Sequence, residues 1–115
     1  MREFIPPHDV YDFAIMESMV DTLFRGEDLP PIVVNGDYAL TGSHRIAAYE
    51  EYVDRTGSSI EISYVEIDDE ILKKALEVFG VGSFQDIDML CEFYKLLYNM
   101  LDDYPALKAA LEDQF

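Results

Sequence analysis

The chain is poor in the residues that build disulfides and metal centres. Its 115 residues include no tryptophan, one cysteine (Cys91) and two histidines, His8 and His44. A single cysteine excludes an internal disulfide and a cysteine-rich metal site, and two histidines without a ligand spacing predict no zinc site. Because Cys91 lies on the apolar stripe of a predicted helix, we expect its thiol to be buried.

Basic residues are also scarce. Eight lysines and arginines stand against 24 aspartates and glutamates, which gives a formal net charge of −16. A charge of this size repels nucleic acid over most of the surface and favours solubility or basic protein partners. We therefore expect no direct DNA binding.

Long apolar runs are missing as well. No stretch approaches the roughly 18 apolar residues of a membrane span, and MREFIPPHDVYDF has charges and prolines where a signal peptide has an apolar run. These features predict a cytoplasmic protein without a membrane partner. Half of the residues are apolar, which suffices for the core of one domain of this length.

Apolar periodicity in the first half predicts a helix, a hairpin and a second helix. The first helix is expected from about Asp9, its N-cap, to Arg25. A β-branched run at 32–34 and a return strand at 38–40 flank Asn35-Gly36-Asp37, a typical hairpin signal. The next helix follows the turn at 41–43, with Ser43 or Thr41 near its N-cap, and ends at Gly57.

The second half predicts one strand and three helices. Apolar and polar residues alternate over 60–67, with a phase slip at Tyr64-Val65. A helix capped by Asp68 ends at Gly80, a long helix over 85–101 is apolar on two faces, and Pro105 opens a short last helix. The order predicts an α+β fold, a small mixed sheet packed with helices. We expect a single domain over 1–115, with a core at about 9–67 and a helical extension at 68–115.

A compact cationic cluster, TGSHR at residues 41–45, stands between the predicted hairpin and the second helix. The first N–H groups of a helix and its dipole attract anions. Gly42 would let a phosphate approach the backbone, Thr41 and Ser43 would add hydroxyl donors, and His44 and Arg45 would add charge. The alternative is an ordinary helix-capping turn in which Arg45 pairs with one of the many carboxylates.

The stretch PPIVVNGDYALTGSHRIAAYEEY resembles the ParB/sulfiredoxin-like family over roughly residues 17–67. That family shows a proline-flanked strand, a hairpin, and a Gly-x-His-Arg or Gly-x-Arg-Arg turn that opens an alanine-rich helix. The resemblance implies that Gly42, Ser43, His44 and Arg45 form a cradle for nucleotide phosphates, with ATP or another nucleotide and Mg²⁺ as the ligand.

Two positions depart from the family pattern. Thr41 stands where many small members have an aspartate, so an acid that could hold a metal or orient the turn is lost. Sulfiredoxins have a cysteine at the position of Ser43, and a hydroxyl cannot form the sulfur intermediate of sulfinic acid reduction. Partition proteins of the family also carry a DNA-binding domain, but residues 68–115 hold 4 basic and 11 acidic residues, a net of 4 − 11 = −7, which disfavours DNA contact.

Catalysis would need a carboxylate that holds Mg²⁺ or acts as a base. Glu17 on the first helix and Asp37 in the hairpin are the candidates for Mg²⁺-dependent nucleotide hydrolysis or phosphoryl transfer. Each also has an ordinary explanation, because Glu17 fits the polar face of an amphipathic helix and Asp37 fits a turn.

A second class of function needs no chemistry. A chain of charge −16 could bind a basic protein groove as a nucleic-acid mimic, in the manner of phage or mobile-element inhibitors. Aromatic and methionine side chains of the predicted helix at 84–101 would supply an apolar anchor or a homodimer face. The same side chains would otherwise form the core of the domain.

Overall fold

The computed structural model describes residues 3–8, 10 and 12–112, and a three-stranded mixed sheet lies at its centre. Strand β1 (Ile32–Asn35) is the middle strand. It pairs antiparallel with β2 (Tyr38–Ala39), with Val34 opposite Ala39, and parallel with β3 (Tyr64–Glu66), with Val33 opposite Val65. The Asn-Gly hairpin and the α+β class are therefore confirmed.

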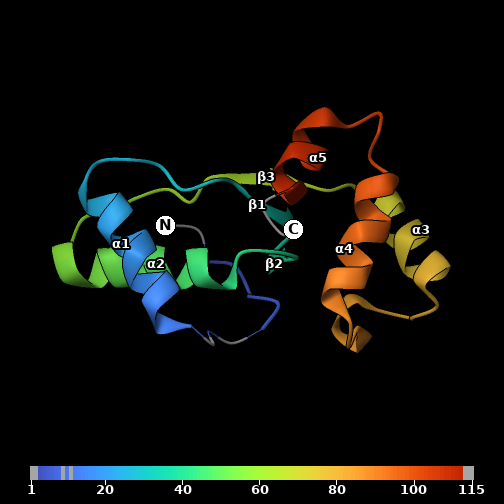
Figure 1. Ribbon diagram of the computed structural model, residues 1–115, viewed down its shortest axis with the longest axis horizontal. Helices are drawn as coiled ribbons and strands as arrows, with labels where there is room; N and C mark the ends of the chain where they lie inside the picture. Colours follow the sequence, from blue (N-terminus) through green and yellow to red (C-terminus); the bar gives the residue numbers. More distant parts are fainter. Residues whose placement is uncertain (1–2, 9, 11, 113–115) are drawn as a thin grey trace.

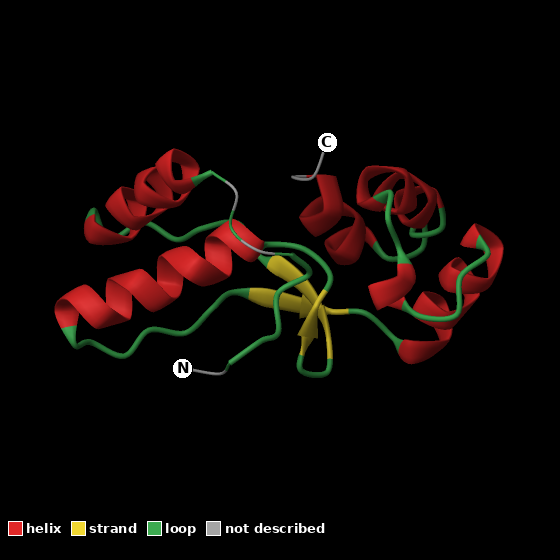
Figure 2. Ribbon diagram, turned by 90° about the horizontal axis from the view of Figure 1, so that it is seen from below, coloured by secondary structure: helices red, strands yellow, loops and turns green. Residues whose placement is uncertain are grey.

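Helices cover both faces of the sheet, as Figures 1 and 2 show. Helices α1 (Phe13–Phe24) and α2 (Ser43–Thr56) pack against each other on one side. Helices α3 (Asp69–Phe79), α4 (Leu90–Asn99) and α5 (Pro105–Glu112) lie on the other side, and α5 contacts both β1 and β3. The expected start of the last helix at Pro105 and the expected cap of α3 at Asp68 are confirmed.

Alternate residues of β1 belong to two separate apolar cores. Ile32 and Val34 pack with α1 and α2 in the first core, whereas Val33 packs with the C-terminal helices in the second core. All three are at most 1% exposed. A short strand buried on both faces has an unbroken run of apolar residues in its sequence, as Ile32-Val33-Val34 does.

Helix α1 begins later than the sequence predicts, whereas α2 begins close to the expected position. Asp12 is the N-cap of α1, because its Oδ1 accepts hydrogen bonds from the N–H groups of Ala14 and Ile15. The predicted cap, Asp9, lies outside the described residues. Gly42 is the N-cap of α2 and Ser43 is its first helical residue, so the expectation that Ser43 or Thr41 lies near this cap is confirmed.

The predicted strand at 60–67 and helix at 85–101 are both shortened. Only Tyr64–Glu66 pair with the sheet, starting at the phase slip in the alternation. The helix is replaced by a 3₁₀ turn, η1 (Phe84–Asp86), and by α4, because Ile87 adopts an extended conformation and enters the core. Cys91 of α4 is exposed, so the expectation of a buried thiol was wrong.

None of the described helices is both long enough and apolar enough to span a membrane.

Candidate functional site

The turn that opens α2 is packed against the central strand. Gly42 has a φ of +93°, and a Cβ added to it would lie 2.2 Å from Cγ2 of Ile32. Only glycine adopts this left-handed conformation readily, and only glycine fits this contact. The requirement for Gly42 thus has a full explanation in packing, without a ligand.

Thr41 and Ser43 use their hydroxyl groups inside the protein. The Thr41 side chain is fully buried, and its Oγ1 accepts a hydrogen bond of 3.0 Å from the N–H of Val33. Ser43 Oγ accepts one of 3.2 Å from the N–H of His8, in the segment before α1. The two hydroxyls predicted as phosphate donors therefore join β1 and the entry segment to α2.

Arg45 is 5% exposed and lies beneath the turn. Its Nη1 donates to the carbonyl oxygens of Pro30 and Pro31 at 2.9 and 2.8 Å. Prolines have no N–H group, so the backbone of this run offers carbonyl acceptors and no donors, and a guanidinium supplies several donors in one plane. Arg45 holds the chain at the point where it enters β1.

His44 joins the start of α1 to α2. Its Nε2 accepts a hydrogen bond of 3.2 Å from the N–H of Asp12, so this nitrogen carries no proton. Burial, followed by the nearby charge of His8, lowers the pKa of His44 below 6.5. The His8 and His44 rings lie edge to face with their centroids 6.0 Å apart. No spacing signal predicts this pair, because 35 residues separate the two positions.

The two predicted catalytic carboxylates lie away from the turn. Glu17 binds Arg55, ten residues beyond Arg45, with contacts of 2.5 and 3.2 Å. Ten residues of α-helix span about 15 Å. The hydrogen bond to Arg55 lowers the pKa of Glu17, which suits an ion pair better than a general base.

Asp37 is exposed at the tip of the hairpin, and its carbonyl oxygen accepts a 2.8 Å hydrogen bond from the N–H of Ile5. Three residues, two of them in strand β2, separate it from Thr41, and four extended residue steps would span about 13 Å. Within the described residues the structure thus brings Thr41 to Arg45 together, but it does not bring Glu17 and Asp37 to them.

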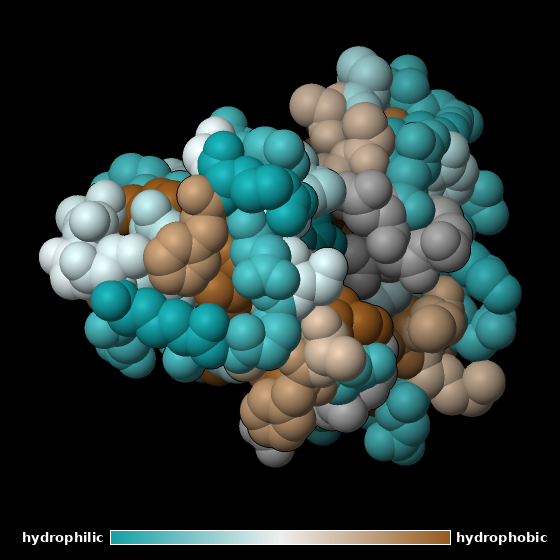
Figure 3. Space-filling view, turned by 60° about the vertical axis from the view of Figure 1, so that its left-hand side comes forward, coloured by the Kyte–Doolittle hydropathy of each residue, from teal (hydrophilic) through white to brown (hydrophobic). Residues whose placement is uncertain are grey.

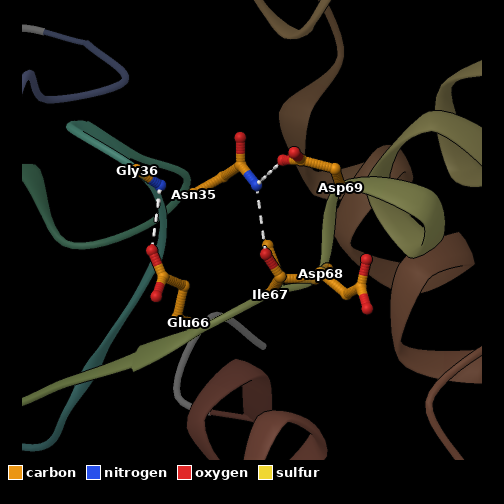
Figure 4. A pocket seen from close by; sticks show the side chains of 6 residues that line it. All are labelled: Asn35, Gly36, Glu66, Ile67, Asp68 and Asp69. Carbon is orange, nitrogen blue, oxygen red and sulfur yellow. Dashed lines mark hydrogen bonds between the residues drawn. The ribbon is translucent and has the colours of Figure 1, made fainter.

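An acidic recess that the sequence did not predict lies at the other end of β1. Glu66, Asp68 and Asp69 line it together with Asn35, Gly36 and Ile67, as Figure 4 shows, around a volume of about 480 Å³. Asn35 Nδ2 donates to Asp69 Oδ1 at 2.6 Å and to the Ile67 carbonyl at 3.0 Å, and Glu66 Oε1 accepts from Gly36 N–H at 3.2 Å. The side chains belong to β1, β3 and the start of α3, and only the parallel pairing of β1 with β3 brings them together.

The described residues contain no group of three or more histidine, cysteine, aspartate and glutamate side chains arranged to hold a metal ion.

No family model, curated protein or solved structure matches the chain. The resemblance to the ParB/sulfiredoxin-like family therefore stays a prediction, carried by the TGSHR turn and the order of elements around it.

We predict that Arg45→Ala destabilises the protein by about 3 kcal/mol, because it leaves two carbonyl groups near the core without a charged donor. Urea unfolding followed by circular dichroism measures the change. Arg25→Ala is the matched control, since this arginine is exposed and pairs with exposed Glu27, so its loss should cost at most about 0.5 kcal/mol. Equal stability of the two variants would contradict the structural role of Arg45.

We also predict that stability falls as the pH drops below about 6.5, because the unfolded chain takes up a proton at His44 that the folded chain resists. Thermal unfolding between about pH 7.5 and about pH 5.5 tests this. The variant His44→Gln keeps an acceptor for the Asp12 N–H. It also keeps all other titrating groups, including Glu50, whose pKa is raised mainly by burial. The wild type should lose more stability than this variant, and parallel curves would refute the prediction.

Proposed function

We propose that the chain is a non-catalytic acidic interaction protein that binds a basic surface of a partner protein. One observation carries this proposal: the fold uses most of its cationic side chains internally. Ion pairs tie Arg25 to Glu27, Arg55 to Glu17 and Glu51, Lys95 to Glu92, and Lys108 to Asp102, while Arg45 is buried.

The remaining surface is dominated by carboxylates. Of the seven described lysines and arginines, only Lys73 and Lys74 are neither buried nor in one of these ion pairs, whereas the sequence has 24 acidic residues. Hydrophilic side chains cover much of the face in Figure 3, with apolar groups between them. A surface of this kind favours fast, salt-sensitive association with cationic partners and repels nucleic acid.

Exposed apolar side chains supply contact area for such a partner. Phe13 is 67% exposed and Met89 62%, and the others above 40% include Phe24, Tyr38 and Tyr64. In contrast, Phe93 and Tyr94 of α4 are buried in the core. An anchor or homodimer face on the segment 84–101 would therefore depend on Met89 and not on these aromatic residues.

We predict that short peptides selected from a displayed random library on the wild-type protein at about 0.05 M salt are enriched in lysine and arginine. Raising the salt to about 0.5 M should weaken their binding by at least about tenfold, because screening removes the attraction between opposite charges. Fluorescence anisotropy measures the affinity. Selected peptides without basic residues, or binding that is indifferent to salt, would refute this function.

A second candidate is nucleotide-phosphate binding at the amino end of α2, with ATP or another nucleotide and Mg²⁺. The start of α2 favours this candidate. Gly42 supplies no side-chain cap and no acidic residue lies in the first turn. The His8 and His44 rings also come together there. Because the side chains of Thr41, Ser43 and Arg45 contact other parts of the protein, we expect the backbone N–H groups to make most of the contacts with an anion.

Titration with MgATP, followed by the backbone amide resonances of residues 43–45, tests this candidate. Phosphate binding should shift these resonances selectively, and His8→Ala should weaken the binding because it removes an exposed ring beside His44. Unchanged resonances at residues 43–45, even at high nucleotide concentration, would exclude this site.

A further inference from the structure

A mainly apolar groove runs between the hairpin and the segment that joins α3 to η1. Its volume is about 270 Å³, and Tyr38, Leu40, Leu72, Leu76 and Phe84 form its walls. Leu40 and Leu76 are buried residues of the second core, whereas Tyr38 is 47% exposed. An apolar side chain placed in this groove would extend a core that already exists.

The groove adjoins the acidic recess, because Asn35 lines both cavities. Glu66, Asp68 and Asp69 at the recess accept hydrogen bonds from neutral donors: Gly36 N–H, Glu70 N–H and the Asn35 amide. Across the described part of the chain, no lysine or arginine pairs with these three carboxylates. Their negative charge is therefore not neutralised by a cation of the fold.

Lys73 and Lys74 follow on α3 but line neither cavity. Leu72 and Leu76, one helical turn apart, form the groove wall, and the two lysines lie between them in sequence and are exposed on α3. The helix thus presents apolar residues to the groove and leaves its cations outside.

We propose that this groove and the acidic recess form the docking site for a peptide segment of the partner protein that carries a lysine or arginine next to an apolar side chain. This inference rests on the proposed interaction function and names its contact surface. The cationic group would enter the recess, where several carboxylates attract it, and the apolar side chain would pack between Leu72, Leu76 and Tyr38. Charge complementarity selects a basic segment and disfavours nucleic acid.

The test uses the peptides selected from the random library and two groove variants. Glu66→Gln with Asp69→Asn removes two charges but keeps the side-chain oxygens that accept hydrogen bonds from Gly36 and Asn35. Tyr38→Thr shortens an exposed wall of the groove and places in β2 a β-branched residue, which also suits a strand. Thermal unfolding confirms that each variant is folded before binding is measured.

The control variant is Asp54→Asn with Glu61→Gln. Both residues are exposed, and they lie near the end of α2 and before β3, whereas the recess is formed at the ends of β1 and β3 and the start of α3. This control removes two negative charges, as the recess variant does, so it measures the general effect of the net charge on binding.

We expect the recess variant and Tyr38→Thr each to weaken binding by about tenfold or more, and the control variant to weaken it by no more than about twofold. Peptides in which the apolar residues are replaced by serine should also bind weakly. Equal losses in the recess and control variants, or full binding by Tyr38→Thr, would overturn the groove while leaving the interaction function intact. Failure of every basic peptide to bind would overturn both.

Discussion

The burial of β1 on both faces is the constraint on which the rest of the structure depends. Val33 faces one core while Ile32 and Val34 face the other, so each group of helices needs this strand to cover its apolar surface. The strand has only four residues, and the contacts at its entrance therefore matter. Arg45 holds the two proline carbonyls that precede it, and Gly42 lets the turn after β2 approach Ile32.

The same contacts explain why TGSHR is ambiguous in the sequence. A glycine, hydroxyl groups, a histidine and an arginine before a helix are what a phosphate site needs, but they are also what a tight joint between a strand, a helix and a proline run needs. Each side chain in the turn has a described partner in the protein. Residue types at a turn thus predict hydrogen-bonding capacity, and only the surroundings decide whether a ligand or the protein uses it.

Local sequence signals predicted several turns and helix starts correctly, whereas tertiary contacts determine the features that the sequence did not predict. Asn35-Gly36, Asp68 and Pro105 mark their turns and helix starts because the signal lies within a few residues. The prediction of one helix over 85–101 was wrong because Ile87 is buried in the core in an extended conformation, and no local pattern indicates this. The acidic recess was equally hidden, since its residues come from β1 and from the β3–α3 junction, which meet only through parallel pairing.

The excess of acidic residues cannot be explained by the stability of the fold. Like charges on a small domain repel one another and weaken the compact state. Most of the described ion pairs are between exposed side chains and contribute little to stability. Carboxylates such as those of Glu66 and Asp69 satisfy neutral donors that an uncharged amide side chain would also satisfy. The negative charge of these carboxylates is therefore not needed for their hydrogen bonds inside the fold, and it is available to the cationic partner that the proposed interaction function requires.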